Sequence, residues 1–327
     1  MAFEYEQEFL GAMACLDADT AKATMLAGGF GPFDYPESGN LSFLGNTLHY
    51  WNDELKKDFI GPLSLDEASS EEEIKDSIYS ALDSVSAGLA HFVSTVFSGT
   101  ASIRDICTDE MPMILAQGWY SVDVLEAFGA LVPDMWDVPT KYGSAIAYTG
   151  CQFGPHSEVP DEWEHWRKEA VDGAIHAYMH DCTKRKFLWF LARGQLPNYA
   201  DNDGFTAAMH AIHFSSFDWV LEIGEENNID LSGSGLVNGE ILHGYTPLMI
   251  ACQVPYTYKL QFIQEFLRQG ADPNVTARDG TSAILIAQAN GEKALVNLLK
   301  NAGAKAPGLF AKLPDSFKEY CKELSIG

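Results

Sequence analysis

The sequence predicts an all-α fold in which short helical hairpins stack one after another. Three observations support this prediction. The segments 193–207 and 269–283 share a frame of Gly, Pro-Asn and Asp-Gly with the same internal spacing. After each frame, apolar residues recur at helical spacing in two successive segments, which is typical of paired amphipathic helices. The glycines that close two such pairs, Gly270 and Gly303, lie 33 residues apart, which indicates a repeated unit.

The best-defined unit begins at Gly244. Thr246 is placed to cap the first helix, and Pro247 occupies the first turn, where a missing N–H costs nothing. Gly270 can adopt the left-handed conformation that ends the second helix. Asp279 and the glycine after it supply the tight turn to the next unit.

This pattern, with G-x-T-P-L-x-x-A opening one helix and Phe-Leu or Leu-Leu before Gly-Ala closing the next, resembles the ankyrin repeat. The resemblance implies an all-α ankyrin-repeat solenoid of about six or seven irregular helix-turn-helix units with insertions. It also implies that a concave surface of turn tips and inner helices binds another protein, without catalysis and without a cofactor.

Further units are predicted upstream. Residues 204–208 open one unit, and residues 111–116 open another, with Met in place of Thr. Residues 142–146 begin a unit that carries an insertion near 153–168 before its second helix at 184–194. The span 70–97 fits the pattern poorly, and we interpret it as a divergent helical hairpin.

The ends of the chain are also predicted to be helical. Residues 45–49 keep part of the opening signature, and Ser70 and Glu73 match a capping box. The polar amphipathic segment 313–327 is expected to cover the exposed face of the final repeat. The predicted division is an acidic ankyrin-like region, irregular repeats, well-matched repeats and a C-terminal capping helix, over residues 1–106, 107–200, 201–306 and 307–327.

The charge of the 327-residue chain, −25, is unevenly distributed. Residues 1–182 hold 8 Lys and Arg against 31 Asp and Glu, whereas residues 183–327 hold 13 against 15. Such a field opposes nucleic acid and anionic membranes and favours a basic protein partner. Acidic residues that only keep the protein soluble would also explain why the net charge is negative. They would not explain why the acids are concentrated in residues 1–182.

The cysteines, the N-terminal segment and the sequence motifs bear on the cellular compartment and on catalysis. The six cysteines form no CxxC pair, and the N-terminal MAFEYEQEFL is acidic where a secretory signal is basic, so we expect a cytoplasmic protein. We also expect the protein to be a monomer when free. His176 and His180 lie four residues apart on a predicted helix but have no HExxH glutamate, so no metal is expected. No GxSxG motif or P-loop occurs, and we expect no enzyme activity.

The candidate binding residues are aromatic side chains beside acids. Trp119 and Tyr120 fall at a turn between two helices, where neither is needed for the apolar stripe. A second group lies in the acidic insertion, where rings could anchor a basic partner while carboxylates pair with its Arg or Lys: Glu158, Asp161, Glu162, Trp163, Glu164 and Trp166. Trp163 and Trp166 could instead hold a helix against the stack. Trp189 and Trp219 are predicted to be core residues.

The sequence therefore favours a non-catalytic protein that binds another protein. The specific hypothesis is an immunity-type inhibitor, or antitoxin, that occludes a basic enzyme or toxin. The alternatives are an ankyrin adaptor or effector that docks onto a larger assembly and, third, an enzyme hidden in the N-terminal region.

Overall fold

The structure is a computed structural model that describes residues 2–31, 34, 43, 69–99, 111–132, 136, 143–151, 165–201, 204–213, 218–227, 232, 243–255, 259–305, 308 and 311–323. The described elements are helices, together with one isolated antiparallel bridge between Ala200 and Thr206. The chain divides into two compact units. Unit 1 comprises Met1–Ala145 and Gln152–Trp189, and unit 2 comprises Ile146–Cys151 and Phe190–Gly327.

Unit 1 begins with a helical pair, α1 (Ala2–Ala14) and α2 (Ala18–Gly28). The side chain of Asp17 caps α2, and Gly29 ends it in the left-handed conformation (φ 71°). Helices α7 (Met111–Gln117) and α8 (Val122–Leu131) form the pair predicted from residues 111–116 onward.

Helix α5 (Glu71–Val96) corrects one prediction. It is a single helix of 26 residues, not a hairpin. The predicted capping box is confirmed: Glu73 N donates to Ser70 Oγ at 3.3 Å, and Ser70 N donates to Glu73 Oε2 at 2.8 Å. The helix continues through Ser86 and Gly88 because buried residues recur at helical spacing along its whole length. The side chain of Ser86 accepts a hydrogen bond from Ser121 N at 3.1 Å, which ties α5 to the start of α8.

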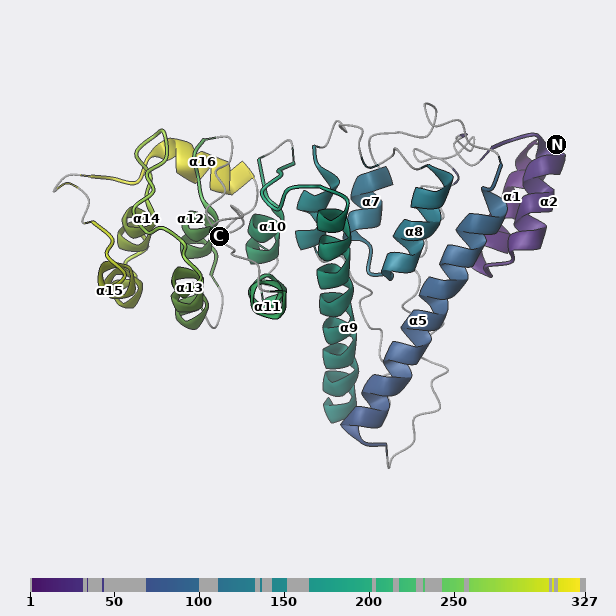
Figure 1. Ribbon diagram of the computed structural model, residues 1–327, viewed down its shortest axis with the longest axis horizontal. Helices are drawn as coiled ribbons and strands as arrows, with labels where there is room; N and C mark the ends of the chain where they lie inside the picture. Colours follow the sequence, from purple (N-terminus) through teal and green to yellow (C-terminus); the bar gives the residue numbers. More distant parts are fainter. Residues whose placement is uncertain are drawn as a thin grey trace. The chain divides into compact units, whose positions relative to one another are not determined.

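Helix α9 (His165–Ala192) corrects a second prediction. The sequence predicted a short second helix at 184–194, but residues 165–192 form one helix of 28 residues. Most of the predicted insertion near 153–168 lies outside the described residues. Within unit 1, Tyr178 anchors it against α5: its hydroxyl donates to Asp83 Oδ1 at 2.8 Å, and its ring meets Tyr79 edge-on at 5.2 Å. Among the described helices, α5 and α9 are the two longest, and Figure 1 draws both.

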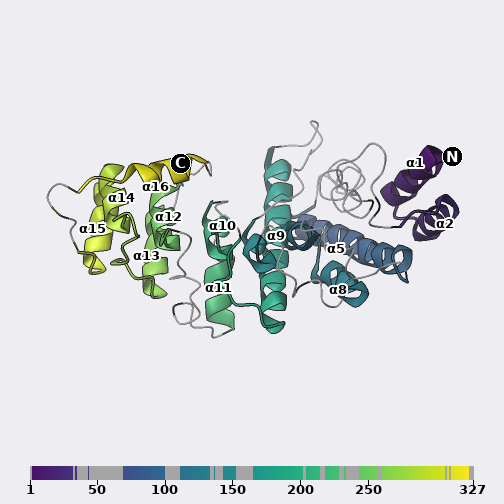
Figure 2. The ribbon, with the colours of Figure 1, turned by 90° about the horizontal axis from the view of Figure 1, so that it is seen from above.

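Unit 2 contains three successive helical pairs, arranged in two rows (Figures 1 and 2). The inner row packs α10 against α12 and α12 against α14, and the outer row packs α13 against α15. Their bounds are α10 (Ala207–His213), α11 (Asp218–Glu226), α12 (Pro247–Gln253), α13 (Lys259–Arg268), α14 (Ala283–Ala289) and α15 (Lys293–Asn301). A last helix, α16 (Asp315–Glu323), follows them.

The local chemistry of these pairs matches the sequence prediction. Thr246 caps α12 by accepting from Met249 N at 3.4 Å, and Pro247 lies in the first turn. Gly270 and Gly303 have φ of 95° and 92°, as predicted for helix stops. At α14 the equivalent Ser282 makes no side-chain cap hydrogen bond. The serine therefore begins α14 without the stabilisation that Thr246 gives to α12.

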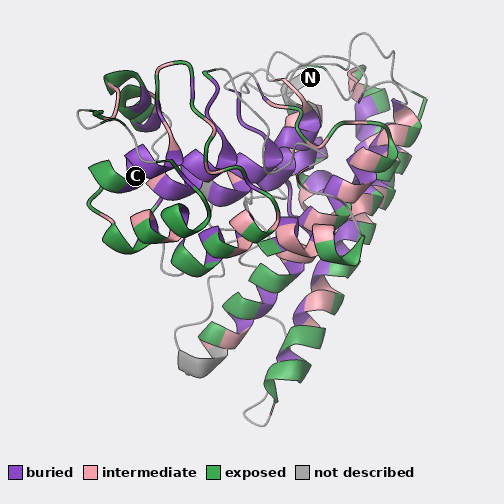
Figure 3. Ribbon diagram, turned by 60° about the vertical axis from the view of Figure 1, so that its left-hand side comes forward, coloured by how far each residue is buried: buried purple, intermediate pink, exposed green. Residues whose placement is uncertain are grey.

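The inner helices are almost completely buried. Every residue of α12 from Pro247 to Cys252 and every residue of α14 from Ala283 to Ala287 is buried, so small and branched side chains predominate there. The outer helices bury one face only, as the two-sided colouring in Figure 3 illustrates. Among the described residues, no helix is both long enough and apolar enough to cross a membrane.

Candidate protein-binding surface

The turns that precede the inner helices of unit 2 are closed by short-range hydrogen bonds. In the last of them, Ala277 N donates to Thr281 O at 2.8 Å, and Gly280 N donates to Ala277 O at 2.9 Å. Asp279 Oδ1 accepts from Thr281 N at 2.9 Å. Gly280 has φ of 89°, a conformation that favours glycine at the tip. The turn therefore holds the Asp279 carboxylate in a defined position.

Aromatic residues follow the glycine in the two preceding turns. Phe205 and Tyr245 occupy this position, and both are buried. The Tyr245 hydroxyl donates to Asp279 Oδ2 at 2.8 Å, which links the turns of two successive units. Burial, followed by this hydrogen bond, raises the pKa of Tyr245 above its ordinary value. The tyrosine therefore remains a donor throughout the physiological range.

Asp279 stays ionised for the complementary reason. Its partial burial would raise the carboxyl pKa, but hydrogen bonds from Ser316, Thr281 and Tyr245 outweigh that effect and lower it. A carboxylate with several donors is a fixed negative charge on this row of turns. Nearby, Asp201 lies 2.7 Å from His210 Nε2, and Asp201 is almost fully buried.

Helix α16 lies across these turns. Its Tyr320 ring is 4.9 Å from Tyr245 and 6.1 Å from both Phe205 and His243, while Phe317 meets Tyr245 edge-on at 5.0 Å. The sequence prediction of a C-terminal helix is confirmed. The predicted position of this helix, over the end of the stack, is not confirmed. Its described contacts are with the turns of three successive helical pairs in unit 2.

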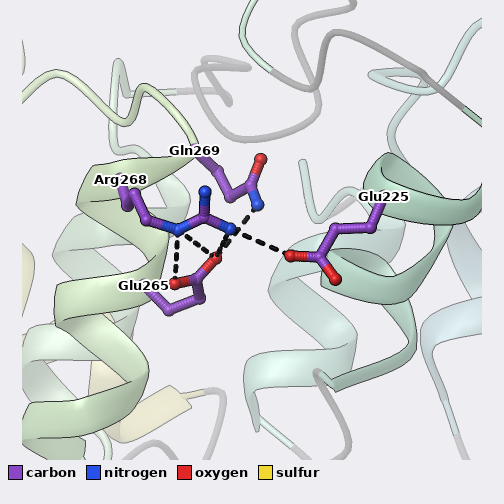
Figure 4. Close-up of polar contacts among 4 residues, drawn as sticks. All are labelled: Glu225, Glu265, Arg268 and Gln269. Atoms are coloured by element: carbon purple, nitrogen blue, oxygen red, sulfur yellow. Dashed lines mark hydrogen bonds and ion pairs between the residues drawn. The ribbon is translucent and has the colours of Figure 1, made fainter.

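The outer row has a separate polar contact, drawn in Figure 4. Arg268 on α13 pairs with Glu265 on the same helix and, at 2.9 Å, with Glu225 on α11. These side chains are largely exposed, so solvent screens the pairs. The contact joins neighbouring units at the surface but offers no buried site for a ligand.

One part of unit 2 is similar to a known protein family. A family model described as Ankyrin repeat matches residues 243–278, which span α12, α13 and the start of the next turn. These residues are therefore similar to the ankyrin repeat. Ankyrin repeats act in binding other proteins and are generally not catalytic, so the match suggests a protein-protein interaction role. No curated protein sequence matches the chain.

The structure contradicts the proposed role of one aromatic pair. Trp119 and Tyr120 are fully buried in unit 1, where their rings pack against each other at 6.0 Å. The Tyr120 hydroxyl donates to Ile114 O at 3.1 Å, and Lys186 Nζ lies 5.1 Å from its ring centroid. The turn between α7 and α8 points inward, against α9, and these rings are core residues instead of surface anchors. Trp189 and Trp219 are buried, as predicted.

The second group of predicted binding residues is not tested by the structure. Five of them, Glu158, Asp161, Glu162, Trp163 and Glu164, lie outside the described residues. Trp166 is in α9, but its side chain is also outside the described part.

The described side chains include one buried lysine with a perturbed pKa but no metal-binding cluster. No cluster of three or more His, Cys, Asp or Glu that could hold a metal ion occurs among them. The most perturbed base is Lys186, which is fully buried in α9, so that desolvation lowers its pKa to about 8. Its neighbour Cys182 is buried as well, and its thiol pKa is raised to about 11. Sequence analysis missed Lys186, since a lysine on a predicted helix is ordinarily exposed.

Proposed function

We propose that the protein is a cytoplasmic, non-catalytic inhibitor of the immunity type, whose acidic unit 1 binds a basic enzyme or toxin and occludes it. The observation that carries this proposal is the charge of the exposed side chains. In the described part of unit 1, the exposed acids are Glu4, Glu8, Asp17, Asp19, Asp34, Glu71, Glu72, Glu73, Asp76, Asp83, Asp123, Glu126, Glu169 and Asp172. The exposed bases in the same residues are Lys75 and Arg185.

A single-sign surface of this kind acts on association before contact. It steers a basic partner toward unit 1, and such steering can raise association rates by about 10-fold to 1,000-fold at low salt. The ankyrin repeat of unit 2 supplies a second protein-binding surface. The acidic insertion at 158–166 remains part of this proposal as an additional contact that combines rings with carboxylates.

The first experiment is an affinity pull-down of the tagged full chain from its source lysate, at low and high salt. The proposal expects one basic protein in near-equal amount, captured less well at high salt, and inhibited by the purified chain. Several partners whose capture ignores salt would instead support an adaptor that docks onto a larger assembly.

A pair of charge-reversal variants locates the interaction. Asp76→Lys with Glu126→Lys changes the charge of unit 1 by +4, and Asp218→Lys with Glu323→Lys makes the same change in unit 2. All four side chains are exposed. We expect the unit 1 variant to lower the association rate at least several-fold at low salt, and the matched unit 2 variant to lower it much less. Equal effects of the two variants would refute a partner site on unit 1.

A further inference from the structure

The surface under α16 is formed by the turns of three successive helical pairs of unit 2. It is covered by only one face of a short helix. Phe317 and Cys321 are buried, Tyr320 is half-buried, and the other residues of α16 are exposed. The buried positions are spaced i, i+3 and i+4, which places them on one side of the helix. One polar contact accompanies them: Ser316 Oγ donates to Asp279 Oδ2 at 2.7 Å.

Helix α16 depends on this surface for its own structure. It has nine residues, and isolated helices shorter than about 12 residues are marginal in water. Unlike the six helices α10–α15, it has no partner in a helical pair, and its described ring contacts are all with turn residues. The chain between Asn301 at the end of α15 and Asp315 tethers it. Helix α16 can therefore leave the surface without disturbing the packing of the inner and outer rows.

Without α16, the surface presents aromatic rings and one ionised carboxylate. Phe205, His243 and Tyr245 supply the rings, and Asp279 supplies the charge. A lysine or arginine at the position of Ser316 would give Asp279 a charge-assisted hydrogen bond, which is stronger than the bond from a hydroxyl. The complementary ligand is an amphipathic helix with a basic residue directly before the first of two aromatic residues spaced three apart.

We propose that the surface formed by Phe205, His243, Tyr245 and Asp279 binds such a helix from a partner protein, and that α16 occupies it in cis until the partner helix displaces it. This surface goes beyond the acidic site of unit 1, and the two proposals stand independently. A short tether gives α16 an effective concentration on the order of millimolar, so an external helix must bind more tightly than α16 to replace it. The basic residue supplies that advantage.

Cys321 provides a readout in the full, unaltered chain. It lies on the buried face of docked α16, where burial raises its thiol pKa to about 12. Release of α16 would expose the thiol and return it to ordinary reactivity. Cys252 in α12 is the internal control, because it is fully buried in the inner row and reacts only when unit 2 unfolds.

The test is alkylation of the native chain by iodoacetamide, with each cysteine quantified by mass spectrometry. The probe is a synthetic peptide of residues 312–325 that carries Ser316→Arg and Cys321→Ala. We expect Cys321 to react at least about ten-fold faster than Cys252 without peptide, because a local opening requires less free energy than global unfolding. We expect the peptide to accelerate Cys321 further, in proportion to its concentration, without changing Cys252.

The control peptide adds Phe317→Ala and Tyr320→Ala and should not accelerate Cys321. Equal rates for Cys321 and Cys252, unchanged by the probe, would overturn the proposal, since α16 would then be a fixed part of unit 2. Equal acceleration by both peptides would also overturn it. Concentration-dependent dimers in which Cys321 stays protected would show that α16 of a second copy, and not a partner helix, occupies the surface.

Discussion

Replacement of Lys186 by Met is expected to stabilise unit 1. Lys186 is fully buried on α9, and desolvation lowers its pKa from the ordinary value of 10.5 to about 8. At pH 7 the side chain is protonated in both the folded and the unfolded chain. The folded state therefore bears the cost of a buried charge, and methionine, which is unbranched and similar in length, removes that cost.

The size of the effect follows from the pKa difference. Lowering the lysine pKa from 10.5 to about 8, at roughly 1.4 kcal/mol per tenfold change in the protonation constant, corresponds to about 3–4 kcal/mol. The lost cation–π contact with the Tyr120 ring, 5.1 Å away, offsets part of this gain. Since such contacts contribute about 0.5–2 kcal/mol, the net stabilisation by Lys186→Met at pH 7 should be about 1–3 kcal/mol.

The pH dependence provides a sign test. Between pH 8 and 10.5 the folded chain has lost the Lys186 proton while the unfolded chain still binds it, so the wild-type protein gains stability as pH rises. The advantage of the methionine variant should shrink over that interval. Buried thiols such as Cys182 act with the opposite sign, because their raised pKa values make stability fall above pH 9. They are present in both proteins, so the comparison largely cancels them.

The assay is urea unfolding of the two proteins, followed by circular dichroism at pH 7, 8, 9 and 9.5. Lys75→Met is the matched control: Lys75 also lies over a tyrosine ring, that of Tyr79 at 5.3 Å, but its side chain is exposed. The control should be neutral or slightly destabilising at every pH. A Lys186→Met protein that is less stable than wild type at pH 7, or whose difference from wild type is the same at pH 7 and pH 9.5, would refute the reasoning.

Three further substitutions have expected outcomes. Gly150→Ala should unfold unit 2 or lower its melting temperature severely, because the added Cβ would lie 2.0 Å from a backbone carbonyl oxygen of α10. Gly173→Ala is the contrasting case: no atom lies within 4 Å of the added Cβ, so it should stabilise α9 by up to about 1 kcal/mol. Ser70→Ala should cost about 1 kcal/mol in urea unfolding by removing the capping box of α5, and Ser80→Ala at an exposed position of the same helix should cost nothing. Trp119→Ala should cost about 3–5 kcal/mol, and a variant that keeps its melting temperature would show that this ring is not a core residue.

Local chemistry explains which features could be predicted. A threonine cap, a proline in the first turn and a glycine with positive φ act on backbone groups within a few residues, so Thr246, Pro247 and Gly270 could be assigned from sequence alone. The same applies to the capping box at Ser70 and to the 33-residue spacing of the helix stops. The uneven charge is likewise a property of the sequence itself.

The tertiary structure decided where helices continue and which side they bury. The span of α5 was interpreted from sequence as a hairpin, but packing against α2 and α8 holds it as one helix. Trp119 and Tyr120 were predicted to lie on the surface, but both are buried. The sequence could not show this, because Lys186 on α9, which lies over the Tyr120 ring, is 66 residues away. Helix α16 was predicted as a helix. Its contacts with Tyr245 and Asp279 depend on the turns of three helical pairs, which only the fold brings together. Contacts between residues so far apart leave no local pattern in a single sequence, which is why the candidate surface emerged only from the structure.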